Sequence, residues 1–164
     1  MLCGDDMTII QDTREKTPWV FPDWVHTRVG TLRTGDYALA GDDAFAIERK
    51  SLDDFVGTIF TGWERFQREL GRMEGAGFVA KVIIVEADYE MLMMVPGQNG
   101  EIIPPRHRHP MISPQAVASR VAELTLMGVT CLFCRDSGHA ALQAYHLFCK
   151  RFFEMRKGII YGSI

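Results

Sequence analysis

Apolar and β-branched residues gather in five short segments, each with the length and composition of a β-strand. The predicted strands cover Met7–Gln11, Thr27–Leu39, Ala44–Lys50, Phe78–Val85 and Val129–Cys134. The second is interrupted by Gly35, and the sequence GDD at 41–43 predicts a hairpin turn between the second and third strands. The nearly continuous apolar run from Phe78 is typical of a central strand that is covered on both faces.

Elsewhere, apolar residues recur at spacings of three and four, which predicts helices. A first helix is expected to begin at Ser51, with Asp53 and Asp54 in its first turn, where the helix dipole favours negative charge. Three more helices are predicted, over about Gly62–Glu74, from the Ser113-Pro114 cap onward, and over Ser137–Lys157. This order of elements predicts an α/β fold with a central mixed β-sheet flanked by α-helices.

Length and composition favour one globular domain over residues 1–164, with a core over about 7–157. Hydrophobic residues make up 47% of the chain and charged residues 24%, and no internal repeat or domain boundary is visible. No apolar run approaches the roughly 20 residues of a membrane helix, and no signal peptide is visible. We therefore expect an intracellular protein with no membrane partner, cytoplasmic in a bacterial or viral setting and nuclear in a eukaryotic one.

The net charge of −3 argues mildly against a protein that coats nucleic acid. Basic residues are nevertheless concentrated in a few places. They lie at Arg65, Arg68 and Arg72, at 106–109, and at 150–157. Carboxylates gathered at a metal site would lower the net charge without weakening a separate basic groove.

The four cysteines leave two interpretations open. Cys131-x-x-Cys134 and His146-x-x-Cys149 suggest the ligand spacing of a zinc site, although the pattern is loose. Free thiols are the default in an intracellular chain, and cysteine is a common small core residue. We therefore favour packing of these cysteines over zinc binding.

One group of residues has catalytic character. Asp36 follows Gly35, and Glu48 and Lys50 end the next predicted strand. Side chains alternate across a strand, so Glu48 and Lys50 share a face, to which the hairpin can bring Asp36. Two neighbouring carboxylates repel each other unless a cation joins them. Taken alone, the three residues fit a solvated salt bridge on a surface hairpin about equally well.

A divalent metal ion would give this group a function. Mg²⁺ prefers carboxylate oxygens and retains several waters. A metal-bound water is easier to deprotonate and can attack phosphorus, while the metal neutralises charge that grows on the phosphate oxygens. Lys50 could orient that water or stabilise that charge. Together with Mg²⁺ or Mn²⁺, the group suits phosphodiester hydrolysis.

The surrounding sequence closely resembles the nuclease domain of the XPF family of structure-selective endonucleases, which includes archaeal Hef. The matching segments are DTREKTPW from Asp12, GDYAL from Gly35, IERKSLDDFVGTI from Ile47 and ERFQREL from Glu64. The family pattern is Gly-Asp, a variable gap, Glu-Arg-Lys, three residues and then Asp. The resemblance is specific from about Ile9 to Val85 and continues to about Lys157 only in the order of elements. It implies the restriction-endonuclease-like, PD-(D/E)XK, fold.

The resemblance also implies roles for the central residues. It assigns metal ligation to Asp36 and Glu48 and a catalytic role to Lys50. Asp12 matches the aspartate of the family's first motif and is expected to belong to the metal site.

Four further positions match the family pattern. Arg14 and Glu15 belong to the first motif and are expected to contact DNA or to brace the site. Arg49 and Asp54 are expected to support catalysis from positions around the metal ligands. For Asp54, a simple role as an acidic residue at a helix start is a fair competing explanation.

The function implied by the resemblance is that of a metal-dependent DNA endonuclease, selective for branched, flap or fork DNA in repair or recombination. Family members pair through this domain, so a homodimer is expected, and no nucleotide cofactor is needed. Larger members carry helix-hairpin-helix modules or a helicase domain, which are not found here, so the preferred DNA structure does not follow. Two alternatives are a non-catalytic DNA-binding partner subunit and a junction resolvase or restriction-like nuclease. The filled acidic positions disfavour the first, and the ERK and DTRE motifs disfavour the second.

Two basic segments are candidates for DNA contacts. The candidate residues are Arg65 and Arg68, with Arg72 on the same helical stripe, and Arg106 and Arg108 in the loop Pro105–Pro110. The plain alternatives are a solvated helix face and an exposed loop without a ligand.

Overall fold

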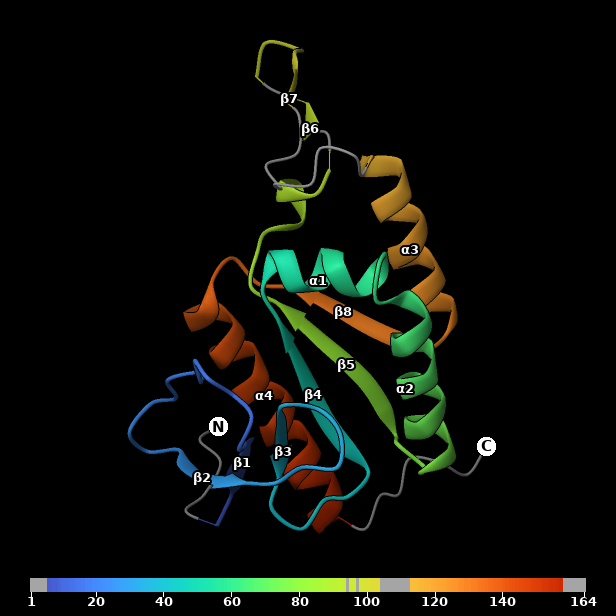
Figure 1. Ribbon diagram of the computed structural model, residues 1–164. Coiled ribbons are helices and arrows are strands. Elements are labelled where there is room, and N and C mark those ends of the chain that lie inside the picture. Colours follow the sequence, from blue (N-terminus) through green and yellow to red (C-terminus); the bar gives the residue numbers. More distant parts are fainter. Residues whose placement is uncertain (1–5, 94, 97, 104–112, 158–164) are drawn as a thin grey trace.

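The computed structural model describes residues 6–93, 95–96, 98–103 and 113–157. Its centre is a six-stranded sheet with the order β2-β1-β3-β4-β5-β8 (Figure 1). The strands are β1 (Thr8–Asp12), β2 (His26–Gly30), β3 (Tyr37–Leu39), β4 (Phe45–Lys50), β5 (Ala80–Val85) and β8 (Val129–Phe133). β3 runs antiparallel to both neighbours, whereas the remaining neighbouring pairs are parallel. The predicted central mixed sheet is therefore confirmed.

Helices flank both faces of this sheet. They are α1 (Leu52–Ile59), α2 (Trp63–Gly75), α3 (Pro114–Leu126) and α4 (Ser137–Arg156). α4 packs on one face, in a core with Ile9, Leu39, Ile47 and Ile84. α1, α2 and α3 cover the other face, and within the described residues the strand side chains in that second core come from β5 and β8 alone. On the second face, β1, β3 and β4 are thus left outside the helical core.

The segment Thr27–Leu39, predicted as one interrupted strand, is two strands on opposite sides of β1. β2 is the parallel outer neighbour of β1, and β3 is its antiparallel inner neighbour. Residues 31–36 must therefore cross the end of β1. Gly35 makes the last turn of this crossing with φ +74°, and a Cβ there would lie 2.8 Å from the Cβ of Ala46. Only glycine combines that conformation with that close approach.

Between β5 and α3, the described residues contribute Ala87 and Leu92 to the α1–α3 core. This part of the chain contains a 3-10 turn, η1 (Tyr89–Met91), and a two-stranded ribbon of β6 (Val95–Pro96) and β7 (Ile102–Ile103). The predicted basic loop Pro105–Pro110, with Arg106 and Arg108, lies outside the described residues. Of the helices in the described ranges, none is long and apolar enough to cross a membrane.

Candidate active site

The β3–β4 pairing brings the two predicted metal ligands together. Tyr37 is paired with Ile47, so the next step of the same antiparallel register places Asp36 beside Glu48. The backbone N–H of Asp36 donates to the carbonyl of Ile47 at 2.9 Å, which holds that step in place. Both carboxylates share a face with Lys50, because side chains alternate along a strand.

The shared face is the one that α1, α2 and α3 leave uncovered over β3 and β4. Glu48 and Lys50 are the register partners of Ile83 and Val85, two residues of the α1–α3 core. The acidic pair therefore lies at the border between that core and the open part of the sheet. Such a border excludes part of the solvent from the carboxylates while leaving one side accessible.

Charge is unevenly balanced within this group. Burial, together with the negative charge of Glu48, raises the pKa of Asp36 to about 7. One Asp36 oxygen accepts a hydrogen bond from the backbone N–H of Arg49 at 2.8 Å. Lys50 Nζ lies 2.5 Å from Glu48 Oε1. Burial alone would lower the pKa of Lys50, but the charges of Glu48 and Asp36 outweigh it and leave that pKa raised. When Asp36 is ionised, the two carboxylates outnumber the single ammonium of Lys50, and a cation could neutralise the excess negative charge.

Asp12 ends β1, and the next step of the β1–β3 register places it beside Asp36. It is fully buried, and its oxygens accept hydrogen bonds from Arg14 Nε at 2.5 Å and from the backbone N–H of Leu32 at 2.7 Å. The Arg14 side chain lowers the pKa of Asp12. The expected role of Asp12 as a metal ligand stays a prediction. Its own N–H donates to the Asp36 carbonyl at 2.8 Å and so ties the two residues together through the backbone.

Arg49 points to the opposite face of β4, where its guanidinium is held on three sides. It donates to both oxygens of Glu86 at 2.8 and 2.9 Å, to Glu15 at 2.8 Å and to Thr17 at 3.1 Å. The side chains of Arg49, Glu15 and Glu86 are only 12–16% exposed. Glu15 therefore braces the site through Arg49, one of the two roles expected for it.

Glu86 is a residue that sequence reasoning missed. It also accepts a hydrogen bond from the Trp19 indole at 2.6 Å, and Trp19 stacks on Tyr37 with ring centroids 4.3 Å apart. Its N–H donates to the Lys50 carbonyl at 2.9 Å. A signal was present: Glu86 directly follows the apolar run of β5, and a polar residue at the end of a buried parallel strand is a candidate for a site.

A protein-family model, the ERCC4 domain, matches residues 12–147 and so spans most of the chain, including Asp12, Asp36, Glu48 and Lys50. The chain belongs to the ERCC4 domain family. A search of curated proteins found no match.

Solved structures show that this ERCC4 domain has the fold of the XPF nuclease domain. XPF from Aeropyrum pernix matches with a TM-score of 0.62 and 22% identity, over 96% of this chain and 65% of that one. XPF from the same organism in complex with DNA matches with a TM-score of 0.61 and 21% identity, over 90% and 66%. The chain thus spans slightly less than two thirds of the length of these relatives. The predicted restriction-endonuclease-like fold is confirmed.

The donor set of this ERCC4 domain suits a hard divalent cation. In the described part of the chain, no group of three or more His, Cys, Asp or Glu side chains is arranged as a metal cage. Asp36 and Glu48 would therefore supply two carboxylate ligands and leave further positions to water or phosphate oxygens, the arrangement that Mg²⁺ prefers. The raised pKa of Asp36 is consistent with a site that requires a cation.

The remaining predicted site residues lie around this centre. Arg14 is 68% exposed while it pairs with Asp12, so it is available to a ligand. Asp54 accepts a hydrogen bond from the Ser51 hydroxyl at 2.7 Å, and Ser51 in turn caps α1 by accepting the Asp54 N–H. This geometry fits the helix-start explanation of Asp54. Arg65 and Arg68 are exposed on α2, away from its buried face.

The zinc interpretation finds no support in the described residues. Cys131 and Cys134 are free thiols, and burial raises the pKa of Cys131 to about 11. Both pack against apolar cores, Cys131 with the α1–α3 side and Cys134 with the α4 side. His146 is exposed on α4, whereas Cys149 is buried.

Proposed function

We propose that this ERCC4 domain is a DNA endonuclease that depends on Mg²⁺ or Mn²⁺ and cuts branched, flap or fork DNA in repair or recombination. The observation that carries the proposal is the placement of Asp36, Glu48 and Lys50 on one open face of the sheet. DNA as the substrate is supported by the similar fold of the Aeropyrum pernix XPF that was solved in complex with DNA.

Asp36 and Glu48 would hold the metal ion, which when bound supplies Lewis-acid chemistry at the scissile phosphate. Lys50 lies on the same face with its ammonium beside Glu48. That ammonium would donate to a phosphate oxygen on which negative charge grows in the transition state. Through its bonds to Glu15 and Glu86, Arg49 fixes the end of β4, which carries Glu48 and Lys50.

The test is a cleavage assay on plasmid, single-stranded, flap and forked DNA with Mg²⁺, Mn²⁺, Ca²⁺ or a chelator. We expect cleavage with Mg²⁺ or Mn²⁺, and binding without hydrolysis with Ca²⁺, which is larger and accepts looser geometry. Lys150, exposed on α4 on the other side of the sheet, gives a matched control variant, Lys150→Ala. Activity that survives the chelator would rule out the metal mechanism. A wild type that binds but never cuts would favour the non-catalytic subunit instead.

We further propose that the domain acts as a homodimer. On α4, Phe148 is fully buried and Phe152 packs against the same core, so both side chains are used within the monomer. Leu142 on α4 remains 49% exposed and Leu126 on α3 90% exposed. Light scattering at tens of micromolar, roughly the range in which specific dimers persist, should give twice the monomer mass, and a monomer there would contradict the proposal.

A further inference from the structure

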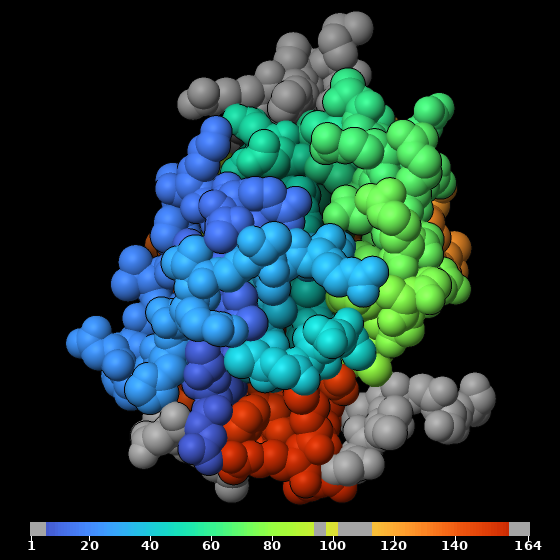
Figure 2. Space-filling model, turned by 60° about the horizontal axis from the view of Figure 1, so that its bottom comes forward, coloured from blue at the N-terminus to red at the C-terminus, as the bar shows by residue number. Residues whose placement is uncertain are grey.

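A pocket of about 350 Å³ adjoins the acidic pair on the same face of the sheet. Its floor is formed by Ile10, Ala38 and Ala46. Ala38 and Ala46 lie two residues along their strands from Asp36 and Glu48, and two strand residues span roughly 7 Å. The space-filling view shows the hollow between the crossing segment that precedes β3 and the end of α2 (Figure 2).

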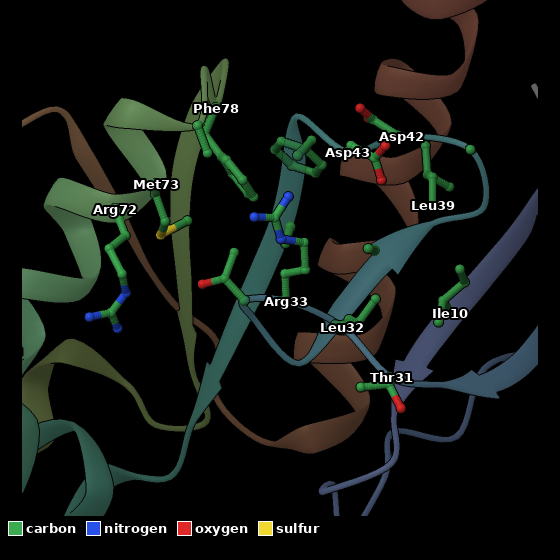
Figure 3. A pocket seen from close by; sticks show the side chains of 16 residues that line it. Ile10, Thr31, Leu32, Arg33, Leu39, Asp42, Asp43, Arg72, Met73 and Phe78 are labelled. Carbon is green, nitrogen blue, oxygen red and sulfur yellow. The ribbon is translucent and has the colours of Figure 1, made fainter.

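The walls combine apolar surface with charge. Met73 and Phe78 form an apolar wall, and Arg33 reaches in among the lining side chains from the crossing segment (Figure 3). Arg72 stands at the rim on the α2 side and points away from the centre. Over the ranges that the structure describes, neither arginine has an ion-pair partner, and Arg33 is exposed although it lines the pocket.

Two acidic residues also line the pocket. They are Asp42 and Asp43, and Asp42 is held in a bidentate pair with Arg151 at 2.6 and 2.9 Å. Arg151 neutralises Asp42, so Asp43 is the acidic residue of the pair that could repel a phosphate. An anionic group is favoured beside the guanidinium of Arg33, which lies among the lining side chains (Figure 3), and an uncharged, flat group is favoured on the alanine floor.

From this arrangement we infer that the pocket receives one unpaired nucleotide of the DNA strand that is cut, next to the scissile phosphate. The volume is at the lower end of the roughly 300–1,000 Å³ of small-molecule pockets, which suits one nucleotide. The base would lie on Ala38 and Ala46 against Phe78, and its phosphate would face Arg33. A base within a duplex cannot reach such a floor without leaving its stack, so an unpaired nucleotide is favoured.

This inference rests on the proposed function, and it adds a reason for a preference for DNA with an unpaired strand. The tests are binding measurements in Ca²⁺ on forked DNA in which each of three nucleotides on either side of the junction is replaced in turn by an abasic residue. One abasic position should weaken wild-type binding about tenfold, the size of one lost base contact. A blunt duplex should show no such position.

The matched variant is Ala76→Phe, which narrows the pocket from an exposed wall position where α2 ends. It should weaken binding of the intact fork about tenfold, and the abasic substitution should then have no further effect, because both changes remove the same contact. Arg33→Ala should weaken binding and lower the salt slope by about one. Lys150→Ala should change neither, and an unchanged thermal midpoint would show that Ala76→Phe folds normally.

Additive effects of Ala76→Phe and the abasic residue, or no sensitive position, would overturn the inference. Displacement of the fork by free dAMP, with no abasic effect, would assign the pocket to a free nucleotide and also overturn it. If the protein cleaves DNA in Mg²⁺ but shows neither the abasic nor the Ala76→Phe effect, the proposed function holds and the nucleotide site is refuted. If both binding effects appear but no cleavage occurs, the nucleotide site holds and the proposed activity is refuted.

Discussion

The two faces of β4 show opposite chemistry within three consecutive residues. Arg49 faces the α4 side, where every nitrogen of its guanidinium has an acceptor in Glu15, Thr17 or Glu86. Its neighbours Glu48 and Lys50 face the other side with Asp36, where burial and repulsion raise the pKa of Asp36 to about 7. The charge of Arg49 is fully paired within the protein, whereas the carboxylates on the other face require a cation from solution. We infer that the first face provides stability and the second reactivity, separated by the thickness of one strand.

The largest expected effect is on cleavage by variants of the reactive face. Lys50→Ala should lower kcat about 10²–10³-fold, the usual cost of losing one donor to transition-state charge, while DNA binding in Ca²⁺ stays unchanged. Asp36→Asn and Glu48→Gln should abolish cleavage. Asp36→Asn should fold at least as well as wild type, since it removes repulsion, whereas Glu48→Gln should be less stable, because it leaves the largely buried Lys50 ammonium without its carboxylate. Single-turnover cleavage of forked DNA measures the loss of activity, and urea unfolding measures the stability of each variant. Equal cleavage by wild type and Lys50→Ala would refute the mechanism.

The reverse pattern is expected on the Arg49 face. Glu86→Gln should destabilise the fold by about 2 kcal/mol, less than the roughly 3–5 kcal/mol for a fully buried broken pair, because the pair keeps some exposure. Arg49→Lys should not restore stability, since an ammonium cannot bind Glu86 in two places while reaching Glu15. Denaturant unfolding with a chelator present gives the comparison. A Glu86→Gln protein as stable as wild type would show that the Arg49 face does not stabilise the fold.

The pH dependence of the free energy of unfolding further distinguishes the Asp36 face from the Arg49 face. The pKa of Asp36 is about 7 in the folded protein and near 3.8 when unfolded. The folded state therefore holds the extra proton between these values, so the contribution of Asp36 to stability falls as pH rises from 4 to 7 and then levels off. Without metal, Asp36→Asn should exceed wild type by on the order of 2 kcal/mol at pH 8 and by little at pH 4. A difference that is constant with pH would contradict this account.

The smallest expected effect concerns the exposed arginines of α2. Arg65→Ala and Arg68→Ala should each reduce the slope of log affinity against log salt by about one, with little dependence on DNA sequence. Fluorescence anisotropy in Ca²⁺ at several salt concentrations measures the slope. If both slopes equal that of wild type, α2 presents only a solvated face, and DNA is held by other residues.

The sequence was most informative where a chemical motif coincided with a local element. The order of strands and helices followed from periodicity, and the Glu48/Lys50 face followed from strand alternation. The split of Thr27–Leu39 into β2 and β3 could not be predicted, because β1 separates the two strands only in the folded sheet.

The residues that brace the site were also beyond the reach of local reasoning. Glu86 lies 37 positions from Arg49 along the chain, and only the parallel pairing of β4 with β5 brings them together. The orientation of the Asp12 carboxylate depends on Leu32, which approaches through the crossing segment. Motifs thus identified candidate chemistry, while the direction in which each side chain points was set by contacts distant in sequence.

The origin of the Arg49 contacts has a consequence for the newly made protein. Chains are synthesised from the N-terminus at roughly 5–20 residues per second, so Asp36, Glu48 and Lys50 all leave the ribosome before Glu86. Until then β4 has no β5 beside it, and Arg49 has no Glu86 to hold it. The proposed cutting centre is therefore incomplete on a nascent chain, even though all three of its reactive residues have been made. The emergence of Glu86 from the ribosome therefore sets the earliest moment at which the proposed site can be complete.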